Sequence, residues 1–155
     1  DGRTSIFDYC SIPTLVRWYN NGNCGIQKLN NKERKIRAFY KKVLRLCNGE
    51  KAISEGAFFD LMYVNYHNLN PNKQYLYLRH YENETLLIAV NFDSQDATVY
   101  ADIPQHAFDF LKIDSGTYFM KELISGKQKT VEFSSNAKFE LHIPAHNGVV
   151  WKIVK

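Results

Sequence analysis

The spacing of apolar residues changes in kind near Gly49, and this change limits what the chain can fold into. Over residues 31–48, apolar side chains recur every three or four positions, which is the period of an α-helix. They are Ile36, Phe39, Tyr40, Val43, Leu44 and Cys47. After Gly49 the period becomes two, which is typical of β-strands. The pattern therefore predicts a mainly β protein preceded by one long helix.

Local signals set the ends of that helix and predict a shorter one before it. Asn30 and Glu33 have the spacing of an N-terminal cap, and Gly49 is expected to end the helix. A second helix is predicted over residues 13–19, because Pro13 suits a first helical turn. The rest of residues 1–30 is rich in turn residues and also in apolar ones, so this stretch needs a surface to cover it.

About eight short strands are predicted after residue 50, separated by turn signals and by no pattern of helix length. The central one is expected around residues 86–90, which are apolar on both faces. The expected fold is an antiparallel Greek-key β-sandwich. The predicted strands cover residues 57–64, 74–81, 85–92, 97–103, 118–124, 130–133, 138–143 and 149–154.

Length and charge limit the classes of function. The chain has 155 residues, whereas a complete (β/α)₈ barrel needs about 250. We therefore expect the tail of a larger domain in residues 1–50 and a complete domain in residues 51–155. The net charge of +4 is mild and no apolar run could span a bilayer, so no nucleic-acid or membrane partner is expected. The basic residues of the long helix are interpreted as its solvated face, with partner binding through them as a weaker alternative.

Reactive groups do not form a recognisable catalytic or metal-binding pattern. There is no Gly-x-Ser-x-Gly sequence, and Pro144 separates His142 from His146, so no helix aligns the two imidazoles. Of the three cysteines, Cys10, Cys24 and Cys47, free thiols are favoured and a Cys10–Cys24 disulfide is left open. We expect no catalytic residue, no metal and no cofactor in this chain.

Several segments, taken in order, resemble one family of enzymes. Residues 2–13 (Gly-Arg-Thr-Ser-Ile-Phe-Asp-Tyr-Cys-Ser-Ile-Pro) resemble the segment after the eighth barrel strand of bacterial members of the alpha-amylase superfamily of glycoside hydrolases. Residues 37–46 resemble the last barrel helix of that family. Each motif is short, and the resemblance rests on the order of these motifs along the chain.

The remaining motifs resemble the family's C-terminal β domain. Residues 77–80 and 86–92 match an aromatic-x-Arg strand followed by a Leu-Ile-x-Val-Asn-Phe strand. Residues 122–126 match an Asp-Leu-Leu-x-Gly hairpin, and residues 143–150 match a closing strand with a Pro-x-x-x-Gly pattern. The resemblance thus implies that residues 1–50 are the last loop and helix of a barrel, a helical remnant, and that residues 51–155 are the C-terminal all-β domain.

The resemblance also implies what the whole protein does. The parent would be a retaining enzyme acting on α-glucosidic bonds of starch or maltooligosaccharides, and this chain would be a non-catalytic fragment of it. The family's catalytic Asp lies in a Gly-x-Arg-x-Asp motif that is absent here. The partner implied is the catalytic barrel of the same polypeptide. Secreted, periplasmic and cytoplasmic locations all remain open.

Sugar contacts are expected at Tyr9, Trp18 and Tyr19, because loops after barrel strands line catalytic faces. Cys10 departs from the family, which has an aromatic residue there. The alternative function is a stand-alone carbohydrate-binding β-sandwich. If the barrel is missing, we expect the apolar stripe of the long helix to self-associate or residues 1–30 to wrap onto it. The aromatic residues available to the alternative are Tyr63, Tyr66, Tyr75, Tyr77, Tyr81, Tyr100 and Trp151.

Overall fold

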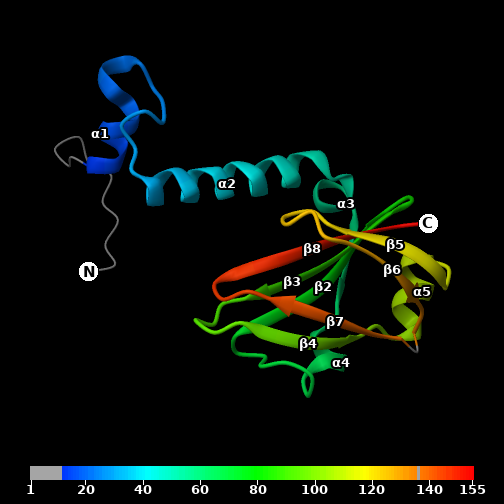
Figure 1. The fold of residues 1–155 in the computed structure, drawn as a ribbon. Coiled ribbons are helices and arrows are strands. Elements are labelled where there is room, and N and C mark those ends of the chain that lie inside the picture. The colour runs from blue at the N-terminus through cyan, green and yellow to red at the C-terminus, as the bar shows by residue number, and fades with distance from the viewer. Residues whose placement is uncertain (1–11, 136) are drawn as a thin grey trace. The chain divides into compact units, whose positions relative to one another are not determined.

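A computed structural model describes residues 12–135 and 137–155 of the chain. The chain divides into two compact units, Asp1–Leu44 and Arg45–Lys155 (Figure 1). The division falls inside the long helix, earlier than the domain boundary that the sequence placed at residue 50. Among the described helices, none has both the length and the apolar character needed to cross a membrane.

The first unit is helical where it is described. It contains α1 (Pro13–Tyr19), the short 3₁₀ turn η1 (Asn20–Gly22) and most of α2 (Asn31–Gly49). Both predicted helices are confirmed. The predicted cap is also present: the Glu33 backbone N–H donates to Asn30 Oδ1 at 2.9 Å, and the Asn30 N–H donates to Glu33 Oε2 at 2.9 Å. This reciprocal pair of bonds starts α2 at its first turn.

The second unit is mainly β, as predicted, and its described residues form eight antiparallel strands. The elements of this unit are α3 (Lys51–Ser54), β1 (Ala57–Asp60), α4 (Met62–Asn65), β2 (Gln74–Tyr81), β3 (Glu84–Asn91), β4 (Ala97–Asp102), α5 (Gln105–Leu111), β5 (Gly116–Glu122), β6 (Gln128–Phe133), β7 (Lys138–Ile143) and β8 (Asn147–Val154). One sheet has the strand order β1-β2-β3-β8-β5-β6, and the other pairs β4 with β7 (Figure 1).

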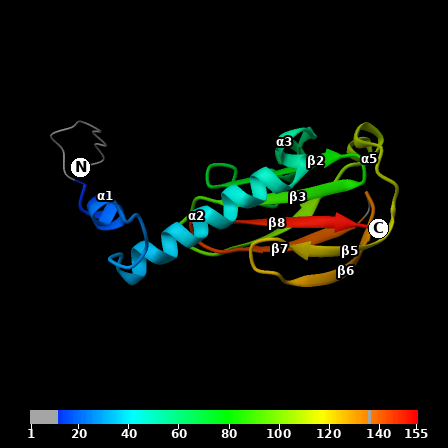
Figure 2. The same ribbon diagram turned by 90° about the horizontal axis from the view of Figure 1, so that it is seen from above.

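The two sheets share one hydrophobic core. Strand β3 lies between β2 and β8 (Figure 2), as its apolar sequence predicted. In the register, Leu87 of β3 stands opposite Trp151 of β8. Leu87 from the larger sheet and Leu141 from β7 are both almost fully buried and belong to the same cluster. The alternating pattern of β7, exposed then buried, places its Phe139, Leu141 and Ile143 in this core.

Short helices interrupt the strands, so the expectation of an unbroken run of strands is wrong. Helix α5 packs Ala107, Phe108 and Leu111 into the core, but it is too short to show a helical period in the sequence. Helices α3 and α4 are shorter still, with four residues each.

The strand predicted over residues 57–64 ends at Asp60, and α4 follows it. The Asp60 side chain accepts a hydrogen bond from the Met62 N–H at 2.8 Å, which turns the chain out of the strand. Asn65, fully buried at the end of α4, then donates to the carbonyls of Leu61 and Asp102 at 2.8 and 2.9 Å. These side-chain bonds replace strand pairing at this position.

Candidate interaction surface

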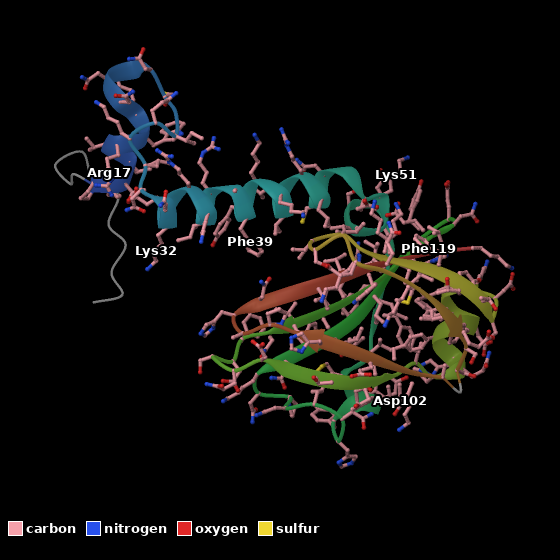
Figure 3. The ribbon with its side chains drawn as sticks, viewed as in Figure 1. Arg17, Lys32, Phe39, Lys51, Asp102 and Phe119 are labelled. Carbon is pink, nitrogen blue, oxygen red and sulfur yellow. The ribbon has the colours of Figure 1, made fainter. Side chains whose placement is uncertain are left out.

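The first unit exposes most of its apolar side chains. No described residue of α1 or α2 is buried. Among the described residues of this unit, only Leu29, in the loop between the two helices, is buried. Phe39 and Leu44 are 39% and 60% exposed, and Figure 3 shows Phe39 projecting from α2. The exposed apolar residues here include Leu15, Val16, Trp18, Tyr19, Ile26, Ile36, Phe39, Tyr40 and Leu44.

Part of this apolar surface forms an open groove of about 490 Å³ between α1 and α2. Trp18 and Leu15 line it from α1, and Ile36 and Tyr40 line it from α2. Polar side chains are confined to a few positions on its wall. The full lining is Thr14, Leu15, Trp18, Leu29, Glu33, Ile36, Arg37 and Tyr40.

An ion pair holds α1 against the start of α2. The Arg17 guanidinium, labelled in Figure 3, forms a bidentate pair with Glu33, in which Nε lies 3.2 Å from Oε2. The Thr14 hydroxyl donates to the same carboxylate at 2.8 Å. The hydrogen bond from Arg17, with that from the Asn30 N–H, lowers the pKa of Glu33 to about 2. Glu33 therefore has two roles: it caps α2, and through Arg17 it holds α1 beside the groove.

Two of the three sugar-contact residues predicted from the sequence, Trp18 and Tyr19, lie in the described part of the chain. Trp18 lines the groove, whereas Tyr19 is 57% exposed and is not among the lining residues. Tyr9 lies outside the described residues. Of the aromatic residues of the alternative function, Trp151 is buried in the core, and Tyr63 and Tyr100 are exposed on α4 and β4. The rings of Tyr75 and Tyr77 lie beside each other on β2, with centroids 5.6 Å apart.

In the second unit, Arg79 holds helix α3 on the sheet. Its Nε donates to the Ala52 carbonyl at 2.8 Å and its Nη2 donates to the Ile53 carbonyl at 2.7 Å. Helix C-terminal carbonyls lack partners within the helix, and a guanidinium satisfies two of them in one fork. Gly56 allows the chain to pass close to α3, because a Cβ at residue 56 would lie 2.4 Å from the Ala52 carbonyl oxygen. The aromatic-x-Arg motif at residues 77–79 thus has a structural role.

A charged cluster completes the seat of α3. Lys152 Nζ lies 2.6 Å from Glu50 Oε2 and 3.0 Å from Glu84 Oε2, and the Ala52 N–H donates to Glu84 Oε1 at 2.9 Å. Burial opposes the charges of Glu84 and Lys152. Their hydrogen bonds outweigh it, so the pKa of Glu84 is lowered and that of Lys152 is raised.

Two further motifs that carry the resemblance each contain a buried polar side chain, Asn91 in one and Glu122 in the other, that links neighbouring segments. Asn91 donates to the Gln95 carbonyl at 2.8 Å and accepts from Gln74 Nε2 at 2.9 Å. Glu122 accepts backbone N–H bonds from Ile124 and Val150, each at 3.0 Å, and from Ser125. These bonds lower the pKa of Glu122 although its burial alone would raise it. Both side chains are committed to holding the backbone.

The titratable groups of the described residues do not gather into a metal-binding cluster. No three His, Cys, Asp or Glu side chains among these residues are grouped to hold a metal ion. Cys24 and Cys47 are free thiols, and Cys10 lies outside the described residues. Asp93 lies two residues after β3, and its carboxylate accepts hydrogen bonds from the Ser94 N–H at 2.7 Å and from Lys73 Nζ at 2.8 Å, as a turn residue does.

Comparison with known proteins gave no matching family model and no matching curated protein. Solved structures do match. An alpha-amylase from Anoxybacillus aligns with a TM-score of 0.54 and 18% identity, over 77% of this chain and 22% of that one. An alpha-amylase from Geobacillus thermoleovorans, complexed with acarbose, aligns with a TM-score of 0.58 and 15% identity, over 86% of this chain and 24% of that one.

A third structure, AmyP in complex with maltose, aligns with a TM-score of 0.60 and 14% identity, over 83% of this chain and 23% of that one. The chain thus spans less than a quarter of the length of these proteins. Because the sequence identities are this low, these matches show a shared fold and nothing more. In fold, the chain therefore resembles a part of the alpha-amylase-family glycoside hydrolases.

Proposed function

We propose that this chain is the non-catalytic C-terminal part of an alpha-amylase-like glycosidase that acts on α-glucosidic bonds of starch or maltooligosaccharides. Residues 1–50 supply the last loop and last helix of its (β/α)₈ barrel. Residues 51–155 form a Greek-key β-sandwich that stabilises the barrel. The partner of this chain is thus the barrel of its own polypeptide.

The observation that carries the proposal is the open apolar groove between α1 and α2. The chain also aligns with less than a quarter of the length of the glycosidases whose fold it shares. Covering one large apolar side chain contributes roughly 1.5–3 kcal/mol. Trp18, Ile36 and Tyr40 remain open to such cover. A barrel's inner strands are the natural cover for its outer helix, because helices ring the strands in this fold.

The residues of this chain also fit a supporting role. Three carboxylates, those of Glu33, Glu84 and Glu122, each accept hydrogen bonds that fix backbone or helix ends. The pKa of each is lowered, whereas a general acid for glycoside cleavage requires a raised pKa. We place the catalytic residues of the parent outside this chain, because the family's Gly-x-Arg-x-Asp motif is absent from it.

The proposal is tested by an immunoblot of source cells with antibodies against this chain, followed by assay of the purified native protein. We expect a band heavier than 18.1 kDa by about 25 kDa or more. That protein should release reducing sugar from soluble starch or maltoheptaose, and the 155-residue chain should release none.

A native band at 18.1 kDa would overturn the proposal, as would a larger protein without activity on α-glucosides. In the first case, isothermal titration of the chain with maltoheptaose would test the alternative function, a stand-alone carbohydrate-binding module.

A further inference from the structure

Asparagine is followed directly by glycine at three places in the chain, Asn21–Gly22, Asn48–Gly49 and Asn147–Gly148. In such a pair the backbone nitrogen of the glycine can attack the side-chain amide carbon of the asparagine, because glycine has no Cβ to hinder the approach. The attack needs a deprotonated nitrogen that faces this carbon, and it needs backbone torsions that are free to change. Regular secondary structure withholds these conditions, so the fold decides which of the three pairs reacts.

The second pair is held inside a helix. Asn48 and Gly49 are the last two residues of α2, in which a backbone N–H donates to the carbonyl four residues earlier. The same pattern continues past the pair, because the Glu50 N–H donates to the Leu46 carbonyl at 3.0 Å. The helix therefore keeps the proton on the Gly49 nitrogen and fixes the torsions of Asn48.

The third pair is held in the six-stranded sheet. Asn147 and Gly148 begin β8 and stand opposite Asn91 and Val90 of β3. The Gly148 N–H donates to Asn147 Oδ1 at 2.8 Å, so the hydrogen, and not the nitrogen lone pair, faces the side-chain amide. A Cβ at residue 148 would lie 3.2 Å from the Ala89 carbonyl oxygen, which leaves the backbone little room to rotate.

The first pair lies in the turn after α1, where neither kind of restraint operates. Asn21 and Gly22 are both exposed. Within η1, Asn21 departs from helical geometry, with φ 53° and ψ 41°, and Gly22 has φ 90°. The left-handed region is strained for an L-residue other than glycine, so Asn21 leaves this conformation more readily than a residue of a helix or strand leaves its own. Of the three pairs, this one best meets the conditions for the attack.

We propose that Asn21–Gly22 is a site of spontaneous deamidation. The Gly22 backbone nitrogen loses its proton to the solvent and forms a bond to Asn21 Cγ. The side-chain nitrogen leaves as ammonia, and a five-membered succinimide ring remains. Water then opens the ring at one of its two carbonyls, which gives aspartate or isoaspartate at residue 21. Water is the one co-reactant, and nothing is oxidised or reduced. The inference does not depend on the proposed function.

The isoaspartate product changes the turn that positions α1. It adds one methylene group to the main chain between residues 21 and 22, and two backbone hydrogen bonds span this point. The Cys24 N–H donates to the Tyr19 carbonyl at 3.1 Å, and the Gly25 N–H donates to the Trp18 carbonyl at 2.8 Å. A longer main chain strains both bonds. Deamidation should therefore loosen the end of α1 that carries Trp18, one wall of the apolar groove.

The test follows all three pairs in one sample of the 155-residue protein. The protein is kept at body temperature in mildly alkaline buffer, and tryptic peptides are quantified by mass spectrometry over time. Trypsin places each pair in a different peptide, because Lys or Arg residues separate them. We expect Asn21 to be converted at least tenfold faster than Asn48 and Asn147. In urea the three pairs should react at similar rates, because the restraints of α2 and β8 are gone.

The matched control is Asn21→Gln, in which a longer side chain forms the ring far more slowly. This variant should leave its peptide unchanged, which shows that the reaction belongs to residue 21 and not to Asn20 or Asn23 of the same peptide. Similar rates at the three pairs in the folded protein would overturn the proposal, as would faster conversion at Asn147 than at Asn21.

A second measurement tests the structural consequence. The isoaspartate form is separated from fresh protein by ion exchange, because the product carries an added negative charge. Amide exchange followed by NMR should then be faster in α1 of this form and unchanged in β3, which lies in the other unit. Equal exchange of α1 in the two forms would show that the turn absorbs the added methylene group, contrary to the inference.

Discussion

The two units use apolar residues at equally regular spacing but bury them to very different degrees. Leu87 of β3 is fully buried, whereas Leu44 of α2 is 60% exposed. The second unit places two sheets and α5 around one core, while α1 and α2 have only a narrow contact with each other. A regular spacing of apolar residues therefore identifies a helix or a strand, but another surface must pack on those residues to bury them.

The interactions that hold each unit together differ in the same way. In the first unit, the described polar contacts around Arg17, Asn30 and Glu33 order the helices at the solvent-exposed rim of the groove. In the second unit, polar junctions such as Asn91 and Glu122 are buried within a packed structure. The first unit is thus expected to be the less stable part of the isolated chain.

The largest expected effect comes from matched leucine truncations. Leu87→Ala should lower the free energy of unfolding of the second unit by about 2–5 kcal/mol, because it leaves a cavity in the core. Leu44→Ala should change it by less than about 0.5 kcal/mol in the isolated chain. Urea denaturation followed by tryptophan fluorescence measures both. Similar losses for the two variants would show that α2 is covered in the isolated chain.

The next effect concerns the seat of α3. Arg79→Lys keeps the charge but removes the fork that satisfies two helix carbonyls, and should cost about 1.5–3 kcal/mol. Arg45→Lys, on an exposed position of α2, is the control and should be neutral. The measurement is again urea denaturation. A neutral Arg79→Lys would mean that α3 stays in place without its guanidinium clamp.

Acid should weaken the second unit through Glu122. Its folded-state pKa lies below the ordinary value of 4.5, so its carboxylate stabilises the fold above that pH. The contribution is lost as the pH falls through the folded-state pKa. Glu122→Gln should be less stable than the wild type at pH 7 and should show a flatter loss of stability below pH 4.5. Parallel pH profiles of thermal midpoints for the two proteins would contradict this role.

The smallest effect is expected in the first unit. Because the pKa of Glu33 is about 2, the contact between α1 and α2 should persist at pH 4 and loosen only as the pH approaches 2. Glu33→Gln should loosen it at every pH. Amide exchange of α1 residues, followed by NMR, reports on this directly. Glu132→Gln, on the exposed face of β6, is a control that should leave this exchange unchanged.

Much of the secondary structure was predictable, because strands and long helices carry a period. The strands at residues 74–81 and 138–143 and the helix at residues 13–19 have the predicted bounds. Helices α3, α4 and α5 were missed, since four to seven residues are too few to show a helical period. The predicted cap at Asn30 was found because a capping box is a local pattern.

The surfaces were less predictable than the elements. Trp18 was singled out and does line the groove, but Tyr19 beside it does not. Phe58 and Phe92, which are 46% and 68% exposed, were not singled out. Whether an aromatic side chain on this face of the sheet is covered depends on where α3 packs, and this is set by contacts such as Arg79 with Ala52, 27 residues apart.

The sequence by itself determined the order and kind of the longer elements and the switch from helix to strands, because these follow from periods of a few residues. Only the tertiary structure decided which apolar faces are covered, because burial depends on segments far apart in the chain. Glu122 illustrates the difference: its turn motif is local, but its bond to Val150 requires β5 and β8 to be neighbours. The open groove between α1 and α2 belongs to that second class.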